Sequence, residues 1–167
     1  MLQEHDPARI SDPLFRASLA EVARLGIPFD ILTFPRHLPE MVRALSATPG
    51  LHAILDHISK PDMTGSVDPN WVSGIRALAE VPGLHCKISG LVTEAGADWT
   101  AERIRPFVEE VAKAFGPNRL VFGSDWPVCT LAATHSQVVD LARDILGGLY
   151  GPEEMQAIMD TNGLRFY

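Results

Sequence analysis

The chain has 167 residues, of which 46% are apolar and 21% are charged, and its formal net charge is −7. This composition is that of a globular domain with a full core, and the absence of any Lys- or Arg-rich block argues against a nucleic-acid partner. The sequence has no run of 18 apolar residues and no signal-peptide core, so we expect a cytoplasmic protein without a membrane partner.

The predicted elements follow one another as a helix, four strand–helix units and a final helix. Short runs rich in Ile, Leu and Val predict the strands, at 27–33, 51–58, 84–91 and 119–126. These runs lack strict alternation of polar and apolar residues, which is typical of strands that are buried on both faces.

Apolar residues at helical spacing predict the helices. Asp12 is placed to cap the first helix, with Pro13 at its first position and Gly26 at its end. Pro106 must lie in the first turn of its helix or kink that helix. The later helices are predicted at 41–45, 71–79, 104–115, 138–146 and from 152 onwards.

Parallel strands joined by helices follow from this order of elements. Four such units form either a small open α/β sheet or half of a (β/α)8 barrel. An open doubly wound sheet usually carries a glycine-rich phosphate turn after its first strand, and neither GxGxxG nor GxxxxGK[ST] occurs. No linker divides the chain, so we expect a single domain over residues 1–167.

Polar residues stand late in the predicted strands, where parallel α/β folds build their active sites. Because side chains alternate along a strand, His57 is expected to share a face with Leu55 and to point away from Asp56. Lys87 and Ser89 share a face of the next strand. With Asp125, which ends the last strand, these side chains are predicted to converge at one mouth.

Each candidate also has a purely structural interpretation. His57 by itself would more often be a hydrogen-bonded structural residue than a ligand. Asp125 could cap the segment that follows it, Lys87 could be a solvated charge, and Trp126 could pack a loop. The joint occurrence of polar residues at successive strand ends favours the functional interpretation.

Three motifs in this order resemble the amidohydrolase-related (amidohydrolase 2) family: "ILDHISKP" (54–61), "CKISGL" (86–91) and "LVFGSDWPV" (120–128). The closing "TNGLRFY" (161–167) resembles the ending of the branch that holds sugar lactonases, such as L-fuconolactonase and L-rhamnono-lactonase. The resemblance covers nearly the whole chain.

The resemblance implies a distorted (β/α)8 barrel, of which this chain would be the C-terminal half. It would hold four parallel strands plus a trace of a preceding one, and about three βα units that carry a His-x-His strand would be absent. The resemblance makes His57 and Asp125 the catalytic residues. The implied substrate contacts are Gln3, His37, Lys87, Ser89 and Trp126.

The implied reaction is the opening of a sugar-derived or related small lactone by an activated water, with a small-molecule lactone or carboxylate as the substrate. Asp125 is the predicted general base. One divalent metal such as zinc could be held by His57 and Asp125, or the enzyme could work without metal, with His57 serving the carbonyl oxygen directly. Two alternatives stay open: a metal-dependent decarboxylase or hydratase, and, since His-x-His is missing, a non-catalytic remnant or half-barrel interaction module.

Half a barrel exposes strand edges and an inner face that barrel closure would cover, so we expect the isolated chain to self-associate. Light scattering after size-exclusion chromatography measures this directly. A monodisperse monomer that melts cooperatively would contradict the expectation.

Overall fold

The computed structural model describes residues 5–167. Its strands are β1 (Phe29–Ile31), β2 (Ala53–Leu55), β3 (His85–Ile88) and β4 (Leu120–Phe122). Its α-helices are α1 (Pro13–Leu25), α2 (Leu38–Ser46), α3 (Pro69–Ala79), α4 (Leu91–Ala95), α5 (Ala101–Phe115), α6 (His135–Gly147), α7 (Pro152–Gln156) and α8 (Asn162–Phe166). Within the described residues no helix is long and apolar enough to cross a membrane.

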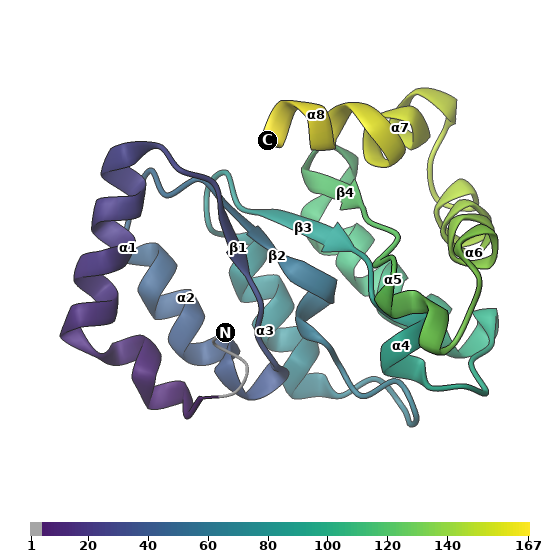
Figure 1. Cartoon of the computed structure of the whole chain (residues 1–167), viewed down its shortest axis with the longest axis horizontal. Coiled ribbons are helices and arrows are strands. Elements are labelled where there is room, and N and C mark those ends of the chain that lie inside the picture. The colour runs from purple at the N-terminus through teal and green to yellow at the C-terminus, as the bar shows by residue number, and fades with distance from the viewer. Residues whose placement is uncertain (1–4) are drawn as a thin grey trace.

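The four strands form one parallel sheet in the order β1-β2-β3-β4 (Figure 1). Asp30 pairs with Ile54, and Lys87 pairs with Val121. Helices alternate with the strands, and α2, α3 and α5 pack against one another in chain order. The predicted α/β architecture of four parallel strands with alternating helices is therefore confirmed.

Local capping explains where the helices begin and end. The Asp12 carboxylate accepts a hydrogen bond from the Leu14 N–H at 2.8 Å, and Gly26 closes α1 in a left-handed conformation with φ 66°. Pro106 lies inside α5, beyond its first four residues. The short helix α4, which the sequence pattern did not predict, begins directly after Gly90.

The two faces of the sheet differ in burial, which corrects the prediction that both are fully covered. Residues such as Ile31, Leu55 and Cys86 face the helices and are buried in the main core. The opposite face, called the inner face below, carries Asp30 and Lys87, which are exposed and partly buried respectively. Alternation along β1 and β3 produces this difference, because successive side chains point to opposite faces.

The C-terminal segment covers part of the inner face. Phe166 packs with Ile54 and Val121 in a small separate apolar cluster. Its ring also stacks on His52, with centroids 4.1 Å apart, and lies 5.0 Å from the ring of His85. The expectation of a bare inner face is thus wrong for the part of the sheet that Phe166 covers.

The same segment protects the outer edge of β4. The Gly123 N–H donates to the Ile88 carbonyl of β3, so by alternation the Leu120 carbonyl is turned to the opposite edge. There the buried Asn162 side chain donates to the Leu120 carbonyl and to the Pro117 carbonyl, both at 2.8 Å. Asn162 therefore satisfies two backbone carbonyl groups at this edge of the sheet.

The Asn162→Ala substitution should lower the free energy of unfolding by about 1–3 kcal/mol, because it leaves buried carbonyl groups without donors. Urea unfolding followed by circular dichroism measures the change. Asn118→Ala, at an exposed position of the adjacent turn, is the matched control and should have little effect. Equal stability of the two variants would contradict a role for Asn162 at this edge.

Candidate active site

A left-handed turn follows β2 and carries the predicted catalytic histidine. His57, Ile58, Ser59 and Lys60 have φ values of 50°, 46°, 61° and 47°. Such backbone costs roughly 1–2 kcal/mol for each residue other than glycine. Strain of this kind persists only where the surroundings over-determine it, and it concentrates at functional sites.

Specific contacts hold this turn in place. The buried Trp71 indole donates to the Ile58 carbonyl at 2.9 Å. The Ser59 and Thr33 hydroxyls, both buried, share a hydrogen bond of 3.0 Å. Lys60 forms an ion pair of 3.2 Å with Glu94.

His57 lies between Ser89 and Asp125. Its Nδ1 shares a hydrogen bond of 2.8 Å with the Ser89 hydroxyl, and its Nε2 lies 3.8 Å from Asp125 Oδ1. The His57 and Asp125 side chains are only 18% and 14% exposed. Burial lowers the pKa of His57, and the nearby carboxylates of Asp125 and Asp56 oppose that shift only in part. The lowered pKa favours the neutral form of the imidazole.

Two glycines make room for this arrangement. A side chain on Gly90 would come within 2.8 Å of His57 Nδ1, and the residue has φ 69°. A side chain on Gly123 would come within 3.2 Å of the Ser89 Cβ and 3.3 Å of the Lys87 Cδ. The glycines of "KISGL" and "VFGSD" thus allow the histidine ring and Ser89 to approach the backbone.

Asp125 is a second strained position, with φ 58°. Its Oδ2 accepts a hydrogen bond from the Thr93 hydroxyl at 3.4 Å, and its backbone carbonyl accepts one from the Cys129 N–H at 2.9 Å. The following Trp126 is 66% exposed. Thr93, in α4, was missed at the sequence level because that helix carried no pattern of its own.

The orientation of the His57 side chain differs from the one predicted. Alternation would have placed it with Leu55, on the face that the helices cover. Because β2 ends at Leu55 and a left-handed turn begins two residues later, the ring instead meets Ser89 and Asp125. Asp56 reaches Lys87, with Oδ1 and Nζ 2.6 Å apart.

The structure brings some predicted substrate contacts together and not others. Ser89 contacts His57 directly, and Lys87 lies on the inner face among carboxylates. His37 is fully buried: its Nδ1 accepts from the Phe34 N–H at 3.0 Å, and its Nε2 lies 3.0 Å from the His5 carbonyl. This geometry gives His37 a structural role and argues against the predicted substrate contact. Gln3 lies outside the described residues.

The donor atoms for a divalent metal are incomplete within residues 5–167. A catalytic zinc site takes about three protein ligands and one open position. His57 Nε2 and Asp125 Oδ1 are close enough to serve as two of them. No group of three His, Cys, Asp or Glu residues that could hold an ion occurs in this part of the chain.

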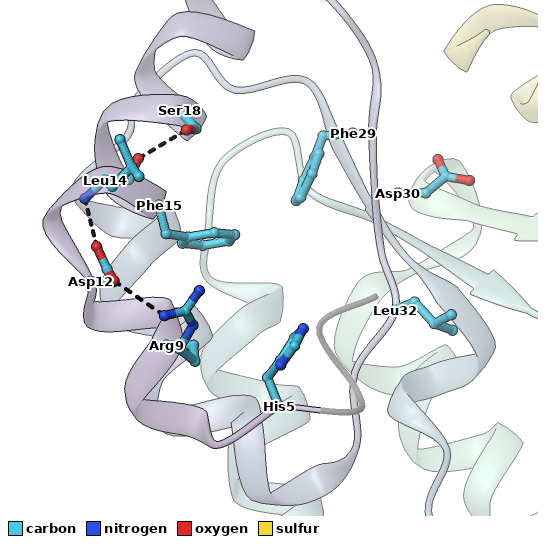
Figure 2. Close-up of a pocket in the computed structure, with 9 residues that line it drawn as sticks. All are labelled: His5, Arg9, Asp12, Leu14, Phe15, Ser18, Phe29, Asp30 and Leu32. Carbon is cyan, nitrogen blue, oxygen red and sulfur yellow. Dashed lines mark hydrogen bonds and ion pairs between the residues drawn. The ribbon is translucent and has the colours of Figure 1, made fainter.

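A cavity of about 470 Å³ lies elsewhere, between α1 and β1 (Figure 2). Phe15 and Phe29 face each other across it, whereas Asp30 points away to the other side of β1. Neither His57 nor Asp125 lines this cavity. This cavity is thus separate from the polar cluster at the carboxyl ends of the strands.

Parallel βα units with polar side chains gathered at the carboxyl ends of β2, β3 and β4 are typical of part of an α/β barrel. Sequence comparison gives the family: the Amidohydrolase (amidohydrolase 2) family model matches residues 2–167. The chain belongs to this family.

Similar proteins are longer than this chain. L-fucono-1,5-lactonase of Burkholderia ambifaria is 33% identical over 171 residues, which cover 100% of this chain and 59% of that protein. L-fucono-1,5-lactonase of Burkholderia multivorans is 35% identical over 96% of this chain and 57% of its own length. A crystal structure of a Burkholderia multivorans amidohydrolase with bound zinc superposes with TM-score 0.93 at 32% identity, covering 99% of this chain and 62% of that one.

The lowered pKa of His57 predicts a pH-dependent stability. The ordinary pKa of histidine is 6.5, and in the folded chain the pKa of His57 is lower. As the pH falls through 6.5, the unfolded chain therefore binds a proton at His57 before the folded chain does. The free energy of unfolding should therefore fall between pH 7.5 and 5.5, and His57→Gln should reduce that fall. Urea titrations at both pH values measure it, with the exposed His135→Gln as control. An unchanged pH dependence in His57→Gln would contradict the prediction.

Proposed function

We propose that this chain supplies part of the active site of a hydrolase that opens a small sugar-derived lactone with an activated water. The observation that supports this most strongly is the placement of His57 between Ser89 and Asp125 at the carboxyl ends of three neighbouring strands. The relatives described above as L-fucono-1,5-lactonases support the same substrate class.

In this proposal Asp125 is the general base. Opening a lactone requires a water to lose a proton as its oxygen attacks the carbonyl carbon, and a carboxylate within hydrogen-bond reach can accept that proton. The Thr93 hydroxyl contacts Asp125 Oδ2, which leaves Oδ1, the atom nearer His57, for the water. The ring C–O bond then breaks and the leaving oxygen takes up the proton that Asp125 accepted, which gives the hydroxy acid and restores the carboxylate.

His57 is proposed to stabilise the carbonyl oxygen as negative charge develops on it. If the Ser89 hydroxyl donates to Nδ1, the proton of the neutral ring is on Nε2, which faces the site. An N–H aimed at the developing oxyanion lowers the barrier more than it stabilises the substrate. Ser89 thus acts by fixing the tautomer of His57 and not as a direct substrate contact.

A divalent ion such as zinc is an alternative to the Nε2–H donor, because a histidine nitrogen that binds a metal carries no proton, and the ion would need further ligands. His57 and Asp125 are the ligands that the described residues would contribute. A bound ion would polarise the carbonyl and lower the pKa of the water. No observation on the described residues favours the decarboxylase or hydratase alternative, so we do not propose it.

The Asp125→Asn substitution should lower kcat for L-fucono-1,5-lactone by about 10²–10⁴-fold, the range that a lost general base costs. The fold should survive, because Asn tolerates the left-handed backbone of this position. A pH-indicator assay of acid release measures hydrolysis, and circular dichroism checks the fold.

The assay uses this chain and also a longer protein in which it is joined to the part of the Burkholderia ambifaria relative that it does not cover. Asp144→Asn, at an exposed ion pair on α6, is the matched control. Undiminished turnover in Asp125→Asn would remove Asp125 from the proposed role, and no hydrolysis by either protein would argue for the non-catalytic interpretation.

A further inference from the structure

Beneath the site, on the inner face, four polar side chains from distant parts of the chain form one network. Lys87 Nζ lies 2.6 Å from Asp56 Oδ1 and 3.1 Å from Asp30 Oδ2. It also donates to the Tyr167 hydroxyl at 3.0 Å. The Tyr167 oxygen lies 2.7 and 2.8 Å from the two carboxylate oxygens of Asp30 and donates to that group. We call these four residues the inner-face cluster.

The inner-face cluster joins three strands and the C-terminal segment. Asp30 belongs to β1 and Lys87 to β3, Asp56 follows β2 directly, and Tyr167 follows α8. Phe166 packs on Ile54 beside it, so an apolar contact anchors the tyrosine next to its polar partners.

Charge balance gives Lys87 a central place in the cluster. Its side chain is only 17% exposed, and a buried ammonium is costly unless it is paired. Burial alone would lower the pKa of Lys87, but hydrogen bonds with Asp56, Tyr167 and Asp30 outweigh that effect and raise it. Lys87 is therefore a fixed cation that separates two carboxylates, and not a free amine available as a nucleophile.

Asp56 links the cluster to the site, since it immediately precedes His57 and the left-handed turn. The stem of Lys87 passes Gly123, where an added side chain would come within 3.3 Å of it, so the absence of a side chain there leaves room for the lysine. A displacement of Lys87 would release the Asp56 side chain and with it one support of the turn.

We propose that Tyr167 and Asp30 are positioning residues: they hold Lys87 on the inner face, and Lys87 through Asp56 holds the turn that presents His57. The catalytic importance of this positioning rests on the proposed function. The physical coupling from Tyr167 to the turn does not, and it is measurable without turnover.

The test compares Tyr167→Phe, which removes only the hydroxyl, with Tyr150→Phe, which removes a hydroxyl that donates to the Ala112 carbonyl on α5. The sequence has three lysines, Lys60, Lys87 and Lys113, and Lys113 is exposed. Brief acetylation with N-hydroxysuccinimidyl acetate, read by peptide mass spectrometry, gives the labelling of Lys87 relative to Lys113. Hydrogen exchange of the amides at 58–60 reports the turn.

In Tyr167→Phe the Lys87 to Lys113 labelling ratio should rise severalfold and the amides of the turn should exchange faster, while Tyr150→Phe changes neither. Asp30→Asn, which weakens the ion pair between Asp30 and Lys87, should change both readouts in the same direction. Agreement between the two variants shows that the effect does not come from a folding defect of one of them. If Lys87 labels faster but exchange in the turn is unchanged, Tyr167 only covers the lysine and the proposal is overturned. Unchanged labelling also overturns it.

A kinetic comparison separates this proposal from the proposed function. Where lactone hydrolysis is present, Tyr167→Phe should lower kcat with little change in KM, and Lys87→Arg should retain more activity than Lys87→Met because it keeps the cation. An equal loss in the two lysine variants would contradict positioning by charge. If hydrolysis is absent from every protein, the proposed function fails, and the labelling and exchange results still decide the coupling.

Discussion

The left-handed turn at His57–Lys60 is the constraint on which the candidate site depends. Four non-glycine residues in this conformation are unfavourable by themselves, and the turn forms only because buried partners hold it. Trp71 binds its backbone, and Thr33 binds its serine hydroxyl. As a result, the side chain of His57, which follows the apolar strand β2, lies beside Ser89 and Asp125.

The parallel sheet provides the other half of this geometry. Because β2, β3 and β4 run in one direction, the segments after them emerge at the same edge and their polar residues are neighbours. Gly90 and Gly123 then decide how closely these segments approach, since a side chain at either position would meet His57 or Ser89. The glycines of the family motifs therefore determine how closely the polar residues of the site can pack together.

The C-terminal segment supports both the edge of β4 and the inner face of the sheet. Asn162 supplies donors to the edge of β4, and Phe166 covers apolar residues of the inner face. Tyr167 brings a hydroxyl to Lys87 and Asp30. These contacts make the segment a structural support of the inner face, although it lies far along the chain from β1.

The sequence by itself determined the parallel strand–helix order, the caps of α1 and the family motifs that contain His57 and Asp125, because periodicity, capping and motifs are local properties. Only the tertiary structure decided the direction of His57, the burial of His37 and the reach of Tyr167 to Asp30, which stand 137 positions apart. The physical reason is that each of these depends on partners distant in the chain. A strained turn or a satisfied buried histidine has no local signature, since the contacts that stabilise it exist only once the sheet and its helices have packed together.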